Sequence, residues 1–187
     1  MRVVAGRFRG RTLTSPSHEG LRPTSDRVRE SLFNILEHGV ADFDLEGVRV
    51  IDLFAGTGAL GIEAISRGAA YCLFVEENAE ARGLIRQNVE ALGLTGATRI
   101  FRRDATSLGP AGTMAPFALA FVDPPYGKGL GEKALTSLAA GGWLSPGALV
   151  VWEERAKVPL VWPPGFNGFD VRTWGDTQIA FARYAGA

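Results

Sequence analysis

The sequence predicts an α/β fold with a mostly parallel sheet, and three observations support this. Short apolar runs typical of buried strands alternate with longer amphipathic segments typical of helices. Several of the apolar runs end at an acidic residue. The last two runs flank a tight turn and therefore predict an antiparallel pair at the C-terminal end. A chain of 187 residues is large enough for a substantial core, and we expect one domain.

The chain opens with a predicted hairpin and a helix. Residues 2–5 and 11–14 flank a glycine-rich turn and predict a small β-hairpin arm, which a polar loop follows up to residue 23. Thr24 or Ser25 can then cap a helix that ends at Gly39. The apolar face of this helix would be formed by Val28, Leu32, Ile35 and Leu36.

Three predicted strand–helix units come next, at residues 48–68, 71–93 and 97–108. In the second unit, Asn78 is the expected helix cap and Gly93 follows the helix end. The repetition of strand and helix is what predicts parallel strands, because parallel neighbours need a crossover between them.

The C-terminal half continues the alternation. Residues 117–122 predict a buried strand, residues 132–140 a helix and residues 148–152 another strand. The final two runs, at 169–174 and 178–184, flank the turn at Gly175 and Asp176 and add one reversed strand to the sheet.

Four acidic residues lie at the carboxyl ends of successive predicted strands: Asp52, Glu76, Asp104 and Asp123. In open α/β sheets, ligands bind outside the carboxyl ends of the strands, so these acids are expected at one binding edge. Glu76 comes 24 residues after Asp52, where an acid can chelate two ribose hydroxyls. Asp104 can accept a hydrogen bond from an adenine amino group.

A glycine-rich turn follows the first of these strands. Gly56, Gly58 and Gly61 match G-x-G-x-x-G, which by itself suggests a dinucleotide site. Asp52 alters this interpretation, because a carboxylate beside the turn would repel a pyrophosphate. It suits a ligand amine or ammonium, such as that of the methionine part of S-adenosylmethionine.

The most informative motif is D-P-P-Y, residues 123–126, at the end of the strand at 117–122. The two prolines stop the strand and stiffen the loop. Asp123 and the prolyl carbonyls are acceptors, and Tyr126 offers an aromatic face. Acceptors beside a flat ring suit the exocyclic amine of a nucleobase that has left its stack.

With these motifs in view, the chain resembles the class I S-adenosylmethionine-dependent methyltransferases that act on nucleobase amines. The block R-P-T-S-D-R-V-R-E-S-L-F-N-I-L at residues 22–36 is similar to the opening of the bacterial 16S ribosomal RNA guanine-N2 methyltransferases of the RsmD type. The resemblance extends from Met1 to the turn at residues 175–177. It implies a Rossmann-like class I methyltransferase fold, a mostly parallel seven-stranded sheet with an antiparallel C-terminal strand and an N-terminal hairpin arm.

The resemblance also implies the site and the partners. It implies methylation of a guanine N2 in 16S rRNA of the small ribosomal subunit, with S-adenosylmethionine as cofactor and no metal. The catalytic residues would be Asp123, Pro124, Pro125 and Tyr126. The cofactor-binding residues would be Asp52, Phe54, Ala55, Gly56, Thr57, Gly58, Gly61, Glu76, Asp104 and Ala105.

The charge is unevenly distributed along the chain, although the net charge is zero. Residues 1–36 hold seven arginines and three acids, a net charge of +4 (7 − 3), which is typical of a phosphate-binding surface. We expect the arm, residues 1–23, to lie beside the mouth of the pocket. The expected RNA-binding residues are Arg2, Arg7, Arg9, Arg11, Arg22 and Arg27, with Arg29 as the seventh arginine of the segment.

Other features restrict the location and the chemistry. Cys72 is the only cysteine and lies in a predicted buried strand, so neither an internal disulfide nor a metal-site spacing is available. His18 and His38 have no motif partners. No apolar run reaches membrane-spanning length and no signal peptide is recognisable, so we expect a cytoplasmic monomer that binds no membrane.

Three other functions remain open at this point. A DNA adenine-N6 or cytosine-N4 methyltransferase explains every motif, but such enzymes usually need an additional target-recognition region. A nicotinamide-dependent oxidoreductase explains the glycine turn and Glu76, but neither Asp52 nor D-P-P-Y. A non-catalytic RNA-binding module explains the basic arm and leaves the four acids without a role.

Overall fold

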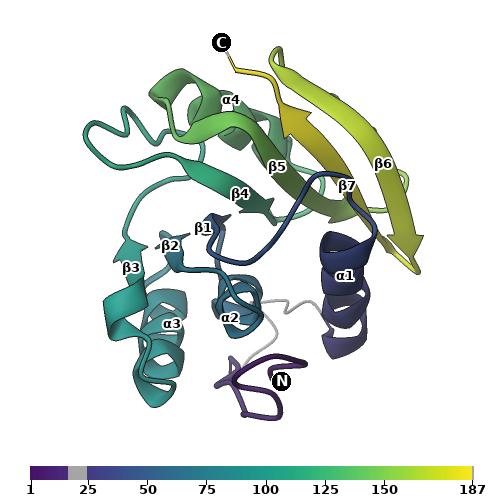
Figure 1. The fold of residues 1–187 in the computed structure, drawn as a ribbon. Helices are drawn as coiled ribbons and strands as arrows, with labels where there is room; N and C mark the ends of the chain where they lie inside the picture. The colour runs from purple at the N-terminus through teal and green to yellow at the C-terminus, as the bar shows by residue number, and fades with distance from the viewer. Residues whose placement is uncertain (17–24, 187) are drawn as a thin grey trace. The chain divides into compact units, whose positions relative to one another are not determined.

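The computed structural model describes residues 1–16 and 25–186. The chain forms two compact units, Met1–Arg102 and Arg103–Ala187, which Figure 1 colours from purple to teal and from teal to yellow. The expectation of one domain for residues 1–187, with an arm at 1–23 and a core at 24–187, stays a prediction.

The first unit holds three parallel strands in the order β3-β2-β1. β1 and β2 are almost entirely buried, and every residue of α2, which packs on them and on the N-terminal arm, is buried. Its elements in chain order are α1 (Asp26–His38), β1 (Arg49–Leu53), α2 (Ala59–Ser66), β2 (Tyr71–Val75), α3 (Ala79–Ala91), the short 3-10 helix η1 (Thr95–Ala97) and β3 (Thr98–Phe101).

The helix ends of this unit follow local sequence signals. The Ser25 hydroxyl accepts a hydrogen bond from the Val28 N–H and caps α1 at 3.2 Å. The Asn78 side chain caps α3 in the same way, at 2.9 Å from the Ala81 nitrogen, and Gly93 follows the helix end. Both predicted caps are therefore confirmed, and Thr24 lies outside the described residues.

The N-terminal arm folds back on itself as expected, but its antiparallel pairing is short. One isolated bridge joins Arg2 and Thr12, and a few backbone hydrogen bonds flank it. Glu63 of α2 fastens the arm, because its carboxylate accepts hydrogen bonds from the backbone N–H groups of Val4 (2.8 Å) and Ala5 (3.1 Å). Figure 1 shows the arm beside α2.

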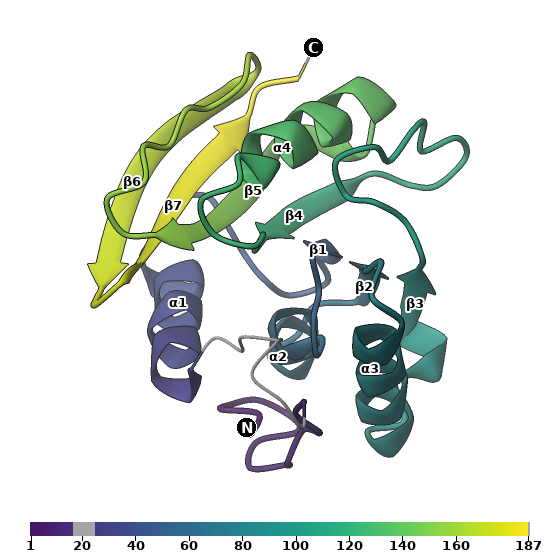
Figure 2. The same cartoon turned by 180° about the vertical axis from the view of Figure 1, so that it is seen from behind.

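The second unit holds four strands in the order β4-β5-β7-β6. β4 and β5 are parallel, whereas β7 runs antiparallel to both β5 and β6, so β7 is the reversed strand. Figure 2 shows α4 lying along β4 and β5. Its elements are β4 (Phe117–Val122), α4 (Leu130–Gly141), β5 (Leu144–Arg155), β6 (Phe166–Trp174) and β7 (Thr177–Tyr184).

One predicted element is wrong. Residues 97–108 were expected to form a strand and a helix, but β3 ends at Phe101 and residues 102–116 form no helix. Asp104 forms a local turn with Thr106. The chain beyond it stays non-helical because Gly109 and Gly112 have positive φ with Pro110 between them. The Arg103 guanidinium instead donates to the Leu108 carbonyl oxygen and closes a compact loop.

β5 is much longer than the predicted strand at 148–152. Its first residue pairs with Phe117, and the register then shifts between Phe117 and Leu119, which accommodates Pro146 and Gly147 in the strand. The α/β fold class with mostly parallel strands and a reversed strand near the C-terminus is confirmed. Among the described residues, no helix is long and apolar enough to cross a membrane.

Candidate active site

The glycine turn after β1 has a backbone that few side chains permit. Phe54 has φ of 57°, Gly56 of 60° and Gly58 of 81°, so the chain turns sharply through the left-handed region. A Cβ on Gly61 would lie 2.5 Å from both Cys72 Sγ and the Phe74 ring, so glycine lets α2 approach β2. Phe54, Ala55, Gly56, Thr57 and Gly58 form the turn for which cofactor binding is predicted, and it is called the cofactor turn below.

Asp52 lies inside β1 and is only 1% exposed. Its Oδ2 accepts a hydrogen bond from the Gly61 N–H at 3.1 Å, within the first turn of α2. This replaces an ordinary side-chain cap, because the N-cap residue Gly58 has none. Burial raises the pKa of Asp52 well above its usual value; the Gly61 hydrogen bond opposes this rise and the charge of Glu76 adds to it.

Glu76 follows β2 directly and is half-buried. Its Oε1 accepts a hydrogen bond from the Gly56 N–H at 2.8 Å, and its Oε2 accepts one from the Asn78 N–H at 3.0 Å. Glu76 thus holds the cofactor turn from the neighbouring strand. Each carboxylate oxygen keeps lone-pair capacity for a hydroxyl of a ligand.

Asp104 and Ala105 lie in the second unit. Asp104 comes three residues after the end of β3, so the prediction that it lies at the tip of this strand is wrong. Asp104 is exposed, and its Oδ1 accepts hydrogen bonds from the N–H (2.8 Å) and the hydroxyl (2.7 Å) of Thr106. This local turn fixes the carboxylate. A role for Asp104 toward an adenine stays a prediction.

The D-P-P-Y loop, residues 123–126, begins immediately after β4 as predicted. Asp123 and Tyr126 are half-buried, Pro124 is buried and Pro125 is exposed. The Tyr126 hydroxyl lies 3.2 Å from Thr177 Oγ1, at the first residue of β7. The tyrosine ring is therefore held at its outer end as well as through the backbone.

Two further residues support this loop, and neither was expected from the sequence. Glu154 of β5 is 2% exposed, and its Oε1 accepts hydrogen bonds from the N–H groups of Gly127 (3.1 Å) and Arg155 (2.7 Å). Arg155, the last residue of β5, places its guanidinium carbon 5.9 Å from the centre of the Tyr126 ring. The adjacent acids Glu153-Glu154 in an apolar strand were the only sequence signal.

The arm follows α2 from its N-terminal end to its C-terminal end. At one end, the Thr57 hydroxyl lies 3.8 Å from the Met1 sulfur, so the start of the arm reaches the cofactor turn. At the other end, the Arg7 N–H donates to the Ser66 carbonyl at 2.8 Å. Met1 therefore lies at the cofactor turn and Arg7 at the opposite end of α2, and the expectation that the arm lies beside the mouth of the pocket stays a prediction.

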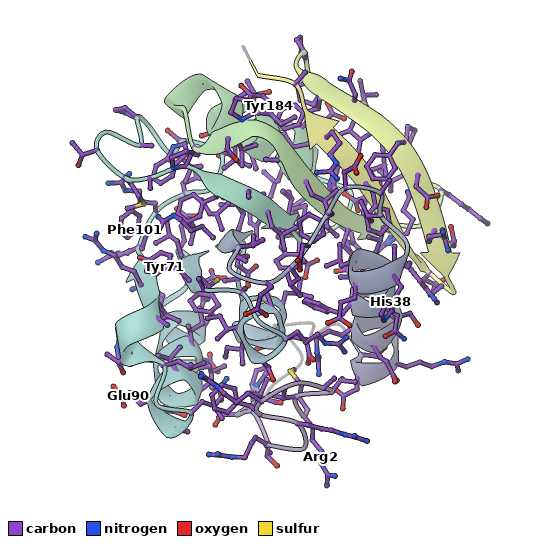
Figure 3. The ribbon with its side chains drawn as sticks, viewed as in Figure 1. Arg2, His38, Tyr71, Glu90, Phe101 and Tyr184 are labelled. Atoms are coloured by element: carbon purple, nitrogen blue, oxygen red, sulfur yellow. The ribbon has the colours of Figure 1, made fainter. Side chains whose placement is uncertain are left out.

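The predicted RNA-binding arginines differ in their surroundings. Arg2, Arg9 and Arg27 are exposed, and Figure 3 shows the Arg2 side chain at the arm. Arg7 is exposed and stacks on the Phe8 ring. Arg11 is exposed and donates to the Ala91 carbonyl at 3.0 Å. Arg22 lies outside the described residues.

Arg29 makes no part of a phosphate surface, although the charge count included it. Its side chain is fully buried and forms ion pairs with Asp26 at 2.8 Å and Glu63 at 3.4 Å. It also donates to the Arg2 carbonyl oxygen. Arg29 therefore joins α1 to the arm and α2, and the positive surface of the N-terminal segment is smaller than the sequence suggested.

A groove of about 820 Å³ lies in the second unit, along α4 and residues 106–110 and 161–164. It includes Thr106, the hydrogen-bond partner of Asp104, but no residue of the D-P-P-Y loop. The described residues contain no cluster of three or more His, Cys, Asp or Glu side chains that could hold a metal ion.

Known proteins resemble the whole chain. The family described as Conserved hypothetical protein 95 matches residues 1–183. Ribosomal RNA small subunit methyltransferase D of Escherichia coli K12 is 39% identical over 87% of this chain and 81% of its own length. The Haemophilus influenzae protein of the same name is 34% identical over 94% and 89%.

Solved structures agree with these sequence matches. The yhhF protein of Escherichia coli superposes with a TM-score of 0.83 at 32% identity, over 100% of this chain and 99% of its own. The methylase HI0767 of Haemophilus influenzae gives a TM-score of 0.78 at 28% identity, over 98% of both chains. The chain therefore belongs to the Conserved hypothetical protein 95 family, the methyltransferase family that includes ribosomal RNA small subunit methyltransferase D.

Proposed function

We propose that this protein transfers a methyl group from S-adenosylmethionine to the N2 amine of a guanine in 16S rRNA of the small ribosomal subunit. The observation that carries the proposal is the D-P-P-Y loop, where a half-buried Asp123 and an anchored Tyr126 follow a buried strand. The relatives named for the small-subunit rRNA support the same substrate class.

The cofactor turn fits S-adenosylmethionine better than a dinucleotide. Residues 54–58 carry no basic side chain, and two carboxylates accept hydrogen bonds from the backbone in and just after this segment, Glu76 from Gly56 and Asp52 from Gly61. A pyrophosphate would be repelled there, whereas the ammonium of an amino acid moiety would be attracted. A Cβ on Gly56 would meet nothing closer than the Phe54 carbonyl oxygen at 4.0 Å, which leaves room for a ligand.

Each acid would have a defined part in holding the cofactor. Asp52 would bind the ammonium, and this cation would relieve the cost of a buried carboxylate. Glu76 would accept hydrogen bonds from the ribose hydroxyls while it still holds Gly56. Asp104 would accept from the adenine amine. When bound, S-adenosylmethionine supplies a methyl group that is already activated by its sulfonium.

The chemical difficulty lies with the nucleophile. A guanine amine shares its lone pair with the ring and is a poor nucleophile. Asp123 and the Pro124 carbonyl would accept its two hydrogens, so that the nitrogen rehybridises and its lone pair is directed outward. Tyr126 would stack on the unstacked base. Asp123 can also accept the proton that the amine loses, directly or through water.

The exposed arginines of the arm would provide the phosphate contacts. Arg2, Arg7 and Arg9 lie on one short segment that Glu63 fastens to α2, so their positions are fixed relative to the cofactor turn. Few base-reading groups accompany them, and recognition would therefore depend on the shape of a folded RNA. We propose that the enzyme acts as a monomer in the cytoplasm, where ribosomal subunits are assembled.

The test is methyl incorporation from labelled S-adenosylmethionine into three substrates at matched salt. These are small subunits from a strain that lacks this gene, protein-free 16S rRNA and duplex DNA. We expect label in the subunits or in the free RNA, and digestion followed by mass spectrometry should identify N2-methylguanosine. Label in another nucleoside would disprove the proposed chemistry, and efficient methylation of duplex DNA with inert subunits would favour a DNA methyltransferase.

A further inference from the structure

A contact between a guanidinium and an aromatic ring joins the end of β5 to the D-P-P-Y loop. The Arg155 guanidinium carbon lies over the Tyr126 ring, 5.9 Å from its centre. Atoms in direct stacking contact lie about 3.5–4.0 Å apart, whereas a cation–π contact extends to about 6 Å from the ring centre, so the guanidinium lies near the outer limit of such a contact. A planar molecule between them would need roughly twice the stacking distance, or about 7–8 Å. The present separation is therefore intermediate between a closed pair and a filled one.

The backbone beneath both side chains is fixed from several directions. One oxygen of the buried Glu154 accepts the N–H groups of Gly127 and of Arg155 itself. Gln178 donates to the Arg155 carbonyl at 2.9 Å. Thr177, which contacts the Tyr126 hydroxyl, is the direct cross-strand partner of Arg155 in the β5–β7 ladder. The two side chains consequently share one rigid support.

The Arg155 guanidinium itself is available. It is exposed, and none of the side chains or carbonyl groups in residues 1–16 and 25–186 forms an ion pair or hydrogen bond with it. An exposed arginine that has no hydrogen bond or ion pair among the described residues can move by the roughly 1–2 Å that separates the present distance from that of a filled clamp. The fixed backbone would keep it over the ring during that movement.

The chemistry of the gap favours a nucleobase over a phosphate. A phosphate entering between the groups would face the negatively polarised surface of the Tyr126 ring. A base is flat, stacks on aromatic rings, and stacks equally well on the plane of a guanidinium. Tyr126 also belongs to the same loop as Asp123, directly after β4.

We propose that Arg155 is the second side of a base clamp, in which the target base is held between the Tyr126 ring and the Arg155 guanidinium. The proposal rests on the proposed function, because it assumes that a base reaches the D-P-P-Y loop. It adds a substrate-binding residue from β5 and assigns Glu154 as a positioning residue for both sides of the clamp.

The experiment measures kcat and KM for small ribosomal subunits, at several salt concentrations, for wild type, Arg155→Ala and Arg155→Lys. We expect Arg155→Ala to lower kcat/KM by roughly 5- to 150-fold, the range for losing one base-stacking side chain. The lysine variant should not restore it, because an ammonium lacks the stacking plane. The slope of log(kcat/KM) against log salt should stay unchanged, since no phosphate contact is lost.

A double-mutant cycle with Tyr126→Ala provides a readout that a structural role would not give. If both side chains hold the same base, the loss in the double variant should be smaller than the product of the two single losses. Arg172→Ala, which removes another exposed arginine in the same unit, is the matched control and should behave as wild type. Affinity for S-adenosylmethionine should be unchanged in every variant.

Three results would overturn the clamp. The first is wild-type kinetics for Arg155→Ala. The second is full rescue by Arg155→Lys together with a reduced salt slope in Arg155→Ala. The third is a loss in the double variant equal to the product of the two single losses. The second would assign Arg155 to a phosphate. Failure of the proposed function is distinguishable, because the wild-type enzyme itself would then leave the subunits unlabelled.

Discussion

The cofactor turn after β1 and the D-P-P-Y loop after β4 are held by the same kind of hydrogen bond. In each, a carboxylate in the neighbouring parallel strand or directly after it accepts the N–H of a glycine: Glu76, after β2, holds Gly56 in the turn, and Glu154, in β5, holds Gly127 next to the loop. The two acids differ in exposure, because Glu76 is half-buried and Glu154 is buried. Glu76 is therefore accessible for the proposed ligand contact, whereas the Glu154 carboxylate is closed off from solvent and bonds only the backbone N–H groups of Gly127 and Arg155 among the described residues.

The largest effect is expected where the D-P-P-Y loop meets the base. Asp123→Ala should lower kcat by about 10²–10³, as the loss of a preorganised polar group does, while affinity for S-adenosylmethionine stays near wild type. Asp123→Asn keeps one acceptor oxygen and should retain more activity. Single-turnover methylation and calorimetry separate the two quantities. A fully active Asp123→Ala enzyme would refute the mechanism.

Glu76→Ala tests the cofactor side of the comparison. It removes the hydrogen-bond acceptor of the Gly56 N–H together with the proposed ribose contact, and should weaken S-adenosylmethionine binding by about 1–3 kcal/mol. Glu76→Gln keeps an acceptor for Gly56 and should lose less. Calorimetry on the three proteins measures this directly, and unchanged affinity in the alanine variant would exclude Glu76 from the site.

Glu154→Ala is the corresponding change for the D-P-P-Y loop. It frees the Gly127 and Arg155 N–H groups, so KM for the RNA substrate should rise by roughly tenfold, equivalent to about 1.4 kcal/mol, with cofactor affinity unchanged. Glu154→Gln retains the acceptor oxygen and is the matched control. If Glu154→Ala instead weakened cofactor binding with an unchanged KM for RNA, the assignment of the two acids to separate regions would be wrong.

The comparison also explains what the sequence could predict. Glu76 was recognisable because it ends an apolar run 24 residues after Asp52, and both acids lie in one strand–helix–strand unit. Glu154 comes 27 residues after Gly127 and lies inside a strand whose register shifts at Phe117 and Leu119. Its partnership with the D-P-P-Y loop depends on that register, and no local pattern encodes it.

Local signals were accurate where short-range contacts decide the structure. The caps at Ser25 and Asn78 follow from side chains that bond three residues ahead. The helix expected within residues 97–108 did not form, because Asp104 and Arg103 form local turn contacts instead. The burial of Arg29 depended on the tertiary position of Glu63, which the sequence pattern does not show.

For the arm we expect a smaller effect, which should be visible mainly in the salt dependence of RNA binding. Replacing Arg7, Arg9 and Arg11 together by glutamine should weaken RNA binding and reduce the log–log salt slope by about 0.7–0.9 for each lost phosphate contact. Arg11 should contribute least, because its guanidinium already donates to the Ala91 carbonyl. Filter binding at several salt concentrations measures the slope, and cofactor affinity should not change.

The matched control for the arm replaces three other exposed arginines of the first unit by glutamine, namely Arg86, Arg99 and Arg102. The two triple variants carry the same change in net charge. Equal salt slopes for both would show that the effect is one of overall charge and would remove the arm from the RNA-binding surface.

The smallest effect concerns the stability of the cofactor turn without its ligand. Burial raises the pKa of Asp52 in the folded protein, so the stabilising contribution of its neutral form is present below the unfolded pKa and is lost as pH rises through the folded pKa. Asp52→Asn stays neutral and still accepts the Gly61 N–H. The variant should therefore melt a few degrees higher than wild type at neutral pH, since about 1 kcal/mol shifts Tm by roughly 2–4 °C at this size. This advantage should shrink as pH falls toward about 4, where the unfolded carboxyl also becomes protonated. Thermal melts from pH 4 to 8 test the sign of this pH dependence.

The same melts with S-adenosylmethionine test whether Asp52 binds the cofactor. The ligand should stabilise wild type more than Asp52→Asn, because only the carboxylate can pair with its ammonium. Equal stabilisation of both proteins by the ligand would leave Asp52 as a helix cap alone.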